Sequence, residues 1–142
     1  RLRKATLTAT QLTEADLTGA DLSEANLSQA DLRGANLEQA NLSHSWLRGA
    51  DLSGANLAQT SLEGANLEDI VLSGANLAGT NFAGAQFTAL AQVPGDGFVA
   101  TVAEPDTGTA LTGVDFSKAI NLQADQLEYV CGQGGIHPAC GR

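Results

Sequence analysis

The sequence predicts an all-β solenoid closed by a short C-terminal α-helical cap, and three observations lead to this prediction. Large apolar residues recur every five positions without a gap, a small residue usually stands two positions before each, and the pattern turns helical near the C-terminus. Internal repetition at a fixed period is typical of repeat architectures. The central positions are Leu7, Leu12, Leu17, Leu22, Leu27, Leu32, Leu37, Leu42, Leu47, Leu52, Leu57, Leu62, Leu67, Leu72, Leu77, Phe82 and Phe87.

The five-residue unit dictates the architecture. A period of five fits neither a helix of 3.6 residues per turn nor an alternating strand. It fits a chain that turns a corner in every unit, so that four units close one coil and the next coil stacks about 4.8 Å away. The central Leu then points inward, and the preceding residue must be small because the corners crowd the interior. The remaining positions face solvent.

Taking every fourth unit shows which residues stack. Asn36, Asn56 and Asn76 fall in one column, where their amides can hydrogen-bond along the solenoid axis. Asp31 and Asp51 share another column. This like-charge stack is either solvated surface, screened by water and ions, or a metal site.

The run ADLTGADLSEANLSQADLRGANLEQANL, residues 15–42, resembles the pentapeptide-repeat family. The resemblance extends over residues 5–89 and implies a right-handed quadrilateral β-helix. It implies no single function, because one fold can carry several unrelated roles.

The length indicates one domain over residues 1–142, with continuous repeats at 5–89. Residues 90–108 break the period and contain two of the three prolines, so we expect a loop insertion there, with Phe98 and Val99 in a short apolar stretch. Loops of this length are often functional, and a disordered insertion is the alternative. The repeat resumes over 109–121, and residues 122–142 form the helical cap.

The cap combines a helix with the two cysteines of the chain. We expect a helix over residues 123–131 that buries Ala124, Leu127, Val130 and Cys131 across the open end of the solenoid. The glycine-rich segment between Cys131 and Cys140 lets the chain reverse, so we predict a disulfide worth about 2–3 kcal/mol in the chain-entropy model. Disulfides persist in oxidising compartments. Two reduced thiols in a cytosolic protein are the alternative.

The terminal block LEYVCGQGGIHPACGR resembles the ends of pentapeptide-repeat proteins from cyanobacteria and plant thylakoid lumens. That resemblance implies export to the thylakoid lumen or periplasm, with a targeting segment removed before Arg1. It also implies a protein without catalytic activity.

Two departures from the repeat mark a candidate partner-binding patch. Trp46 occupies an outward position beside His44, and Val71 lies outward on the adjoining side, one coil further on. Exposed aromatic residues often anchor protein interfaces. The alternative is that Trp46 lies flat over a corner and Ile70 fills a local void.

No catalytic constellation is found. His44 and His137 are far apart in the chain, and no metalloprotease, P-loop or nucleophile-elbow pattern occurs. Cys131 with His137 resembles a thiol–imidazole pair, but Cys140 makes a disulfide the better interpretation. We therefore expect no enzyme activity, no cofactor and no metal. The net charge of −9 disfavours direct nucleic-acid binding, and no apolar run approaches the roughly 20 residues of a membrane span.

Two functions remain. The first is a rigid, monomeric interaction or structural module with an unknown protein partner. The second is an acidic mimic of duplex DNA, like the pentapeptide-repeat inhibitors of DNA gyrase, since the repeats hold ten acidic and two basic residues, a net of eight negative charges. Against the mimic, polar uncharged residues interrupt the acidic columns.

Overall fold

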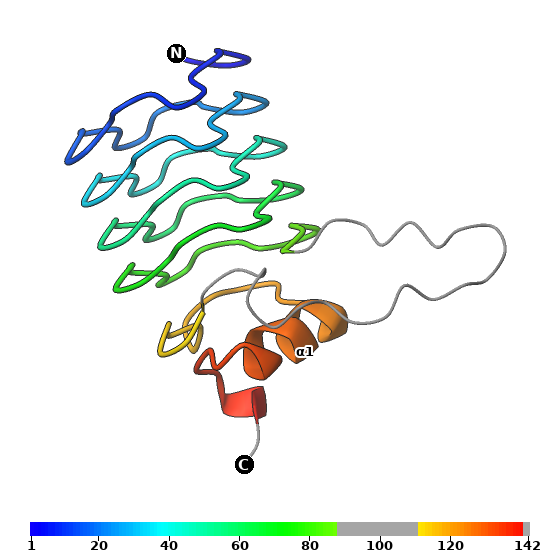
Figure 1. Ribbon diagram of the computed structural model, residues 1–142. Coiled ribbons are helices and arrows are strands. Elements are labelled where there is room, and N and C mark those ends of the chain that lie inside the picture. Colours follow the sequence, from blue (N-terminus) through cyan, green and yellow to red (C-terminus); the bar gives the residue numbers. More distant parts are fainter. Residues whose placement is uncertain (88–110, 141–142) are drawn as a thin grey trace, which may run out of the picture.

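The computed structural model describes residues 1–87 and 111–140 and shows a stack of coils that ends in a helix (Figure 1). Parallel bridges join residues twenty positions apart, such as Thr6 with Asn26, Asn26 with Trp46 and Trp46 with Asn66. Four five-residue units therefore make one coil. Among the described residues, every β contact is an isolated bridge, because a turn follows so soon that only a short part of each unit stays extended.

The same backbone hydrogen bonds connect each pair of coils. The Leu57 N–H donates to the Asn76 carbonyl at 2.8 Å, and the Asn76 N–H donates to the Ala55 carbonyl at 2.9 Å. A third bond runs from the Gln59 N–H to the Ala78 carbonyl at 2.8 Å. The ladder thus satisfies the backbone groups that every corner would otherwise leave unpaired.

Each corner is a hydrogen-bonded β-turn with a left-handed third residue. In one example, the Ala55 N–H donates to the Leu52 carbonyl at 3.0 Å, and Gly54 has a φ of 69°. Such a turn needs a positive φ, which glycine adopts without steric cost. Other residues also take this conformation, including His44 with a φ of 59°. The repeat therefore imposes backbone strain at many of its non-glycine corners.

The core is a column of leucines that becomes aromatic toward the C-terminal end. Leu22 and the central leucines below it are buried, as are most of the small residues before them. Below them, the rings of Phe82 and Phe116 lie 5.6 Å apart, and those of Phe87 and Tyr129 lie 5.8 Å apart. These larger side chains carry the core from the coils to the cap.

Two of the threonines at the small corner position bind the backbone through their hydroxyl groups. The Thr60 and Thr80 hydroxyls donate to the carbonyls of Leu37 and Leu57 at 2.6 and 2.7 Å. The Ser45 hydroxyl is buried and has no hydrogen-bond partner among the described residues. The corner therefore accepts a hydroxyl, and threonine places it better than serine does here.

From residue 111 onward, the described chain continues the stack. Ile120 forms a bridge with Asn81, and Asp115 forms a bridge with Ile136. The expected loop at 90–108, with Phe98 and Val99, lies outside the described residues.

The cap helix α1 spans Ala124–Gly132 and is tied to the last corner by Gln126. Its side-chain amide donates to the carbonyls of Phe82 and Ala85, both at 2.7 Å, and its oxygen accepts the Gln123 N–H at 2.6 Å. One coil above, the corresponding carbonyl belongs to Ala65, and it accepts the backbone N–H of Gln86 at 2.9 Å. The glutamine amide thus replaces a backbone donor where the repeats end.

The buried face of α1 differs from the expected one. Val130 is buried and Leu127 and Cys131 are half-buried, but Ala124 is exposed, and the buried polar residue Gln126 takes part in the contact instead. The expectation for Ala124 is therefore wrong. The helix is rotated so that the glutamine amide meets the open carbonyls of the coil.

The chain beyond α1 closes the end of the stack. Cys131 and Cys140 form a disulfide with their Cα atoms 5.1 Å apart, and the short helix η1 spans Pro138–Cys140. Between the cysteines, the Ile136 N–H donates to the Val114 carbonyl at 2.7 Å and its carbonyl accepts the Phe116 N–H at 2.7 Å. The disulfide thus encloses the last bridge of the solenoid. Within the described residues, no helix is long and apolar enough to cross a membrane.

Two glycines test the strain at the corners. A Cβ on Gly54 would meet no atom within 4 Å, whereas one on Gly64 would lie 2.5 Å from Nδ1 of His44. Because both have a positive φ, Gly54→Ala should lower the free energy of unfolding by about 1 kcal/mol, from backbone strain alone. Gly64→Ala should lower it further, and this additional loss should disappear in the His44→Ala background. Chemical denaturation of the four variants provides the measurement, and equal losses for both glycines would contradict the described position of His44.

The contribution of Gln126 can be measured by Gln126→Met, which keeps the size of the side chain and removes its hydrogen bonds. We expect a loss of about 2 kcal/mol in chemical denaturation, because the Phe82 and Ala85 carbonyls are left without this donor. Gln11→Met is the matched control, since Gln11 is exposed, and it should change stability little. A Gln126→Met protein as stable as this control would show that the amide does not hold the cap.

Candidate functional site

Trp46 is the most exposed large hydrophobic residue in the described part of the chain, with 55% of its surface accessible. Its backbone is held on both sides: its N–H donates to Ala25 at 2.9 Å, and its carbonyl accepts from Leu27 at 2.7 Å. The residues above and below it in the column are Asn26 and Asn66. A rigid backbone thus presents one indole ring among small polar neighbours.

Arg48, two residues after Trp46, forms ion pairs with the coil below. Its Nε lies 2.7 Å from Glu68 and 4.0 Å from Asp69. The column of Arg48 and Glu68 therefore stands between Trp46 and Val71, which is half-buried on the adjoining side. The structure does not merge Trp46 and Val71 into one apolar patch.

His44 lies on the other side of Trp46, at an exposed corner. Its ring covers Gly64 one coil below, where a Cβ would come within 2.5 Å of Nδ1. Trp46 is thus flanked by an imidazole and a guanidinium. We call Trp46, His44, Arg48 and Glu68 the Trp46 surface.

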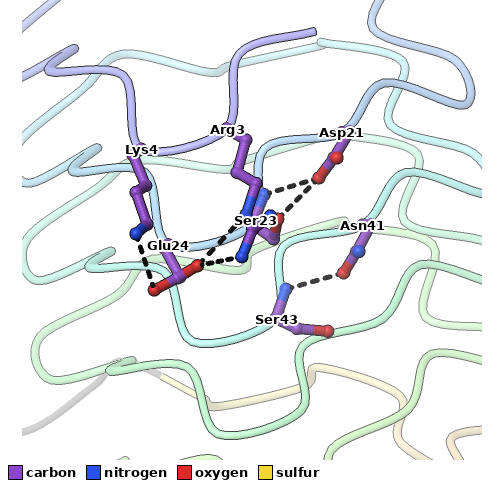
Figure 2. A network of polar contacts seen from close by, with 7 residues as sticks. All are labelled: Arg3, Lys4, Asp21, Ser23, Glu24, Asn41 and Ser43. Carbon is purple, nitrogen blue, oxygen red and sulfur yellow. Dashed lines mark hydrogen bonds and ion pairs between the residues drawn. The ribbon is translucent and has the colours of Figure 1, made fainter.

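The first coils carry a polar network around Glu24 (Figure 2). Arg3 lies 2.8 Å and Lys4 3.9 Å from the carboxylate of Glu24. The hydrogen bond from Arg3 lowers the pKa of Glu24. This acidic residue is therefore partly neutralised by the basic N-terminal residues.

Aspartate and asparagine at the second position of the unit bind the backbone two residues further on. The Asp21 carboxylate accepts the Ser23 hydroxyl at 2.6 Å and its N–H at 3.1 Å, and the Asn41 side-chain oxygen accepts the Ser43 N–H at 3.0 Å (Figure 2). The Ser23 hydroxyl and N–H lower the pKa of Asp21. These are Asx turns, so the acidic repeat position has a local structural use.

The Asp31 and Asp51 column contains its own cation. Arg33 donates to both carboxylate oxygens of Asp31, at 2.8 and 2.6 Å. These bonds and the Arg33 N–H lower the pKa of Asp31 to about 2. Asp51 instead accepts the Ser53 hydroxyl at 2.5 Å. The described residues contain no group of three or more His, Cys, Asp or Glu side chains suited to a metal ion.

The asparagine ladder expected from the sequence is confirmed. The Asn56 amide donates to the Asn36 oxygen at 3.2 Å, and the Asn76 amide donates to the Asn56 oxygen at 3.1 Å. On the same side, the Gln39 amide donates to the Gln59 oxygen at 3.1 Å.

The described residues do not bring a nucleophile and a base together. Cys131 is in the disulfide, and Nδ1 of His137 accepts the Ala139 N–H at 3.0 Å. The sequence interpretation missed Arg48, Glu68 and Gln126. The twenty-residue column places Arg48 next to Glu68 and could have indicated that pair. No sequence signal separates Gln126 from the other polar residues of the helix.

The repeats define the class of protein to which this chain belongs. The family model for pentapeptide repeats matches residues 1–39, 35–74 and 55–89, with eight copies. The chain is therefore a member of the pentapeptide-repeat family. No curated protein sequence matches it.

Solved structures extend this comparison. The chain is similar to HetL, a pentapeptide repeat protein involved in heterocyst differentiation regulation in Nostoc, with 39% identity, a TM-score of 0.57, and coverage of 58% of this chain and 38% of HetL. It thus spans about two fifths of HetL. A pentapeptide repeat protein of the Arabidopsis thaliana thylakoid lumen is 26% identical over 96% of this chain and 79% of its own, also with a TM-score of 0.57.

QnrB1, a plasmid-mediated fluoroquinolone resistance protein, is 24% identical over 54% of this chain and 37% of its own, with a TM-score of 0.51. At this identity, the likeness shows the fold alone.

Proposed function

We propose that this chain is a non-catalytic interaction module of the thylakoid lumen or periplasm. It is a right-handed quadrilateral β-helix that binds a protein partner through the Trp46 surface. Proteins of the pentapeptide-repeat family are generally structural or interaction modules, and this proposal assigns the chain to the second kind.

The exposed indole of Trp46 is the observation that carries the proposal. The Trp46 side chain has 55% of its surface accessible, and covering this apolar surface with a partner lowers the free energy of the complex. Its backbone is fixed by the ladder, so binding orders little beyond the side chain itself. His44 and Arg48 add a polar rim of the kind that surrounds interface anchors.

The compartment is supported by two observations. The Cys131–Cys140 disulfide encloses the last bridge of the stack, where reduction would release the end of the cap. A thylakoid-lumen protein of the same family is similar over 96% of the chain. Both agree with an oxidising compartment.

A DNA-mimic function is the second candidate, supported by the eight net negative charges of the repeats. It is less favoured because polar uncharged residues interrupt the acidic columns and because Glu24 is paired with Arg3, which lies outside the repeats counted. Both features reduce the continuous negative potential that a DNA-binding enzyme would meet.

Trp46 is the only tryptophan, so its fluorescence reports directly on the proposed surface. We expect acrylamide to quench its emission in the free protein, and a partner from lumenal or periplasmic extract to reduce this quenching. Trp46→Ala should abolish capture of that partner on immobilised protein, because the anchor is lost, while changing the thermal midpoint little. Gln11→Ala, an exposed substitution at the same unit position, is the matched control and should retain capture. Equal capture by Trp46→Ala and the control would refute the assignment of this surface.

The compartment has its own test in the mass of the protein from native cell fractions, non-reduced, with and without alkylation. We expect a mass two hydrogens below that of the dithiol form and no alkylation, because both sulfurs are in the disulfide. We also expect a mature N-terminus near Arg1 in the lumenal or periplasmic fraction. Alkylated thiols on a cytosolic chain would rule out this compartment.

A further inference from the structure

A second candidate site lies on the side of the solenoid that carries the asparagine ladder, independent of the Trp46 surface. On this side, successive coils are joined by one bridge per unit, from Asp16 to Asn36, to Asn56 and to Asn76. The next residue in the stack is Asp115, which itself bridges Ile136 on its far side. The bridge between Asn76 and Asp115 is missing.

The backbone groups that would form this bridge make no hydrogen bond with the described residues. One coil above, the Leu57 N–H donates to Asn76 and the Asn76 N–H donates to Ala55. The equivalent groups at the gap are the Leu77 N–H, the Ala75 carbonyl, and the N–H and carbonyl of Asp115. Among the described residues, none of these four groups bonds across the gap. These groups line an open cleft, where water or the main chain of a partner can hydrogen-bond to them.

The opening ends at the following corner, where contacts between the two coils are formed. The Gly79 N–H donates to the Lys118 carbonyl at 2.8 Å, and the Ile120 N–H donates to the Thr80 carbonyl at 2.8 Å. The coils are therefore joined at the next corner. On the preceding side, the Leu72 and Gly74 N–H groups form no backbone bond with the described residues, so the opening extends beyond Asp115.

A cleft of about 170 Å³ opens at this place, lined by Ala75, Asn76, Leu77, Ala78, Asp115 and Lys118. Its effect is seen in the wall residues. Ala55 is fully buried, whereas Ala75, at the same position one coil further, is half-buried. The volume lies below the roughly 300 Å³ of the smallest typical small-molecule sites.

The chemistry of the walls indicates which occupant fits. Each wall offers one backbone donor and one backbone acceptor, the pattern that a β-strand presents to a neighbouring strand. The Asp115 carboxylate is already engaged, since it accepts the Ser117 N–H at 2.8 Å. Lys118 is exposed and forms no ion pair with the described residues. The alanines on the upper wall leave room only for small side chains.

We propose that this cleft binds a short extended peptide segment of small residues from a partner protein. The segment takes the place of a strand between the two coils and hydrogen-bonds both walls through its main chain, as in β-strand addition. Lys118 at the mouth adds a charge contact for an acidic group next to the inserted residues.

Amide hydrogen exchange of the full chain, resolved by NMR, tests the site. Without peptide, the Leu77 amide should exchange faster than the Leu57 amide, which occupies the same position in a closed bridge. Adding N-acetyl-Gly-Ala-Gly-amide should slow exchange at Leu77 and Asp115, by about tenfold at ten times the dissociation constant. Leu57 should not respond.

Ala78→Phe and Ala58→Phe form a matched pair. Both alanines are half-buried at the same unit position, but only Ala78 lines the cleft. Ala78→Phe should abolish the protection by the peptide, and Ala58→Phe should retain it. Three outcomes would overturn the proposal: Leu77 exchanging as slowly as Leu57 without peptide, no response of the wild-type protein to the peptide, or equal protection in both variants. The first two need only the wild-type chain, so the test stands even if Ala78→Phe does not fold.

Discussion

The structure depends on the left-handed residue that closes every five-residue unit. A positive φ at that point turns the chain, and the turn is locked by the hydrogen bond from the next small residue, as from Ala55 to Leu52. Because the turn comes every five residues, the chain returns to the same side after twenty. Only then can the backbone of one coil meet the backbone of the next in register. The backbone strain at single residues such as His44 is thus offset by the regular hydrogen-bond ladder that the turns make possible.

Regular stacking also determines what the surface side chains can do. The residue before each central Leu bridges two coils through its backbone and, when it is Asp or Asn, binds its own turn through its side chain, as Asp21 and Asn41 do. Acidic residues in this position are therefore part of the repeat. Some carboxylates also lie in ion pairs, such as Glu68 with Arg48, so the negative charge is not spread evenly over the surface. This weakens a function based on charge alone and favours one based on shape.

The period explains how much could be predicted. Column arithmetic is sufficient for the Asn36–Asn56–Asn76 ladder and for the exposure of Trp46, because both follow from the twenty-residue return of the chain. Outside the repeat, only local pattern was available, so helix α1 was located to within one residue but its buried face was misjudged at Ala124. The role of Gln126 depends on two carbonyls more than forty residues earlier in the chain. Helical periodicity contains no information about such a contact.

Function in such a fold is expected where the repeat is broken, since a perfect repeat offers the same surface on every coil. The repeat is interrupted in this way at two places. At Trp46, an indole replaces a small polar side chain, and between Asn76 and Asp115 no bridge is formed. The two places differ in kind. At Trp46, the ladder is intact and only the side chain changes, so recognition there is a matter of apolar area. At Asp115, the side chains are ordinary for the repeat and the backbone itself is open, so recognition there relies on main-chain hydrogen bonds and tolerates many small-residue sequences. The two columns lie ten residues apart in a coil of twenty, on opposite sides of the solenoid, so each site can be occupied without blocking the other.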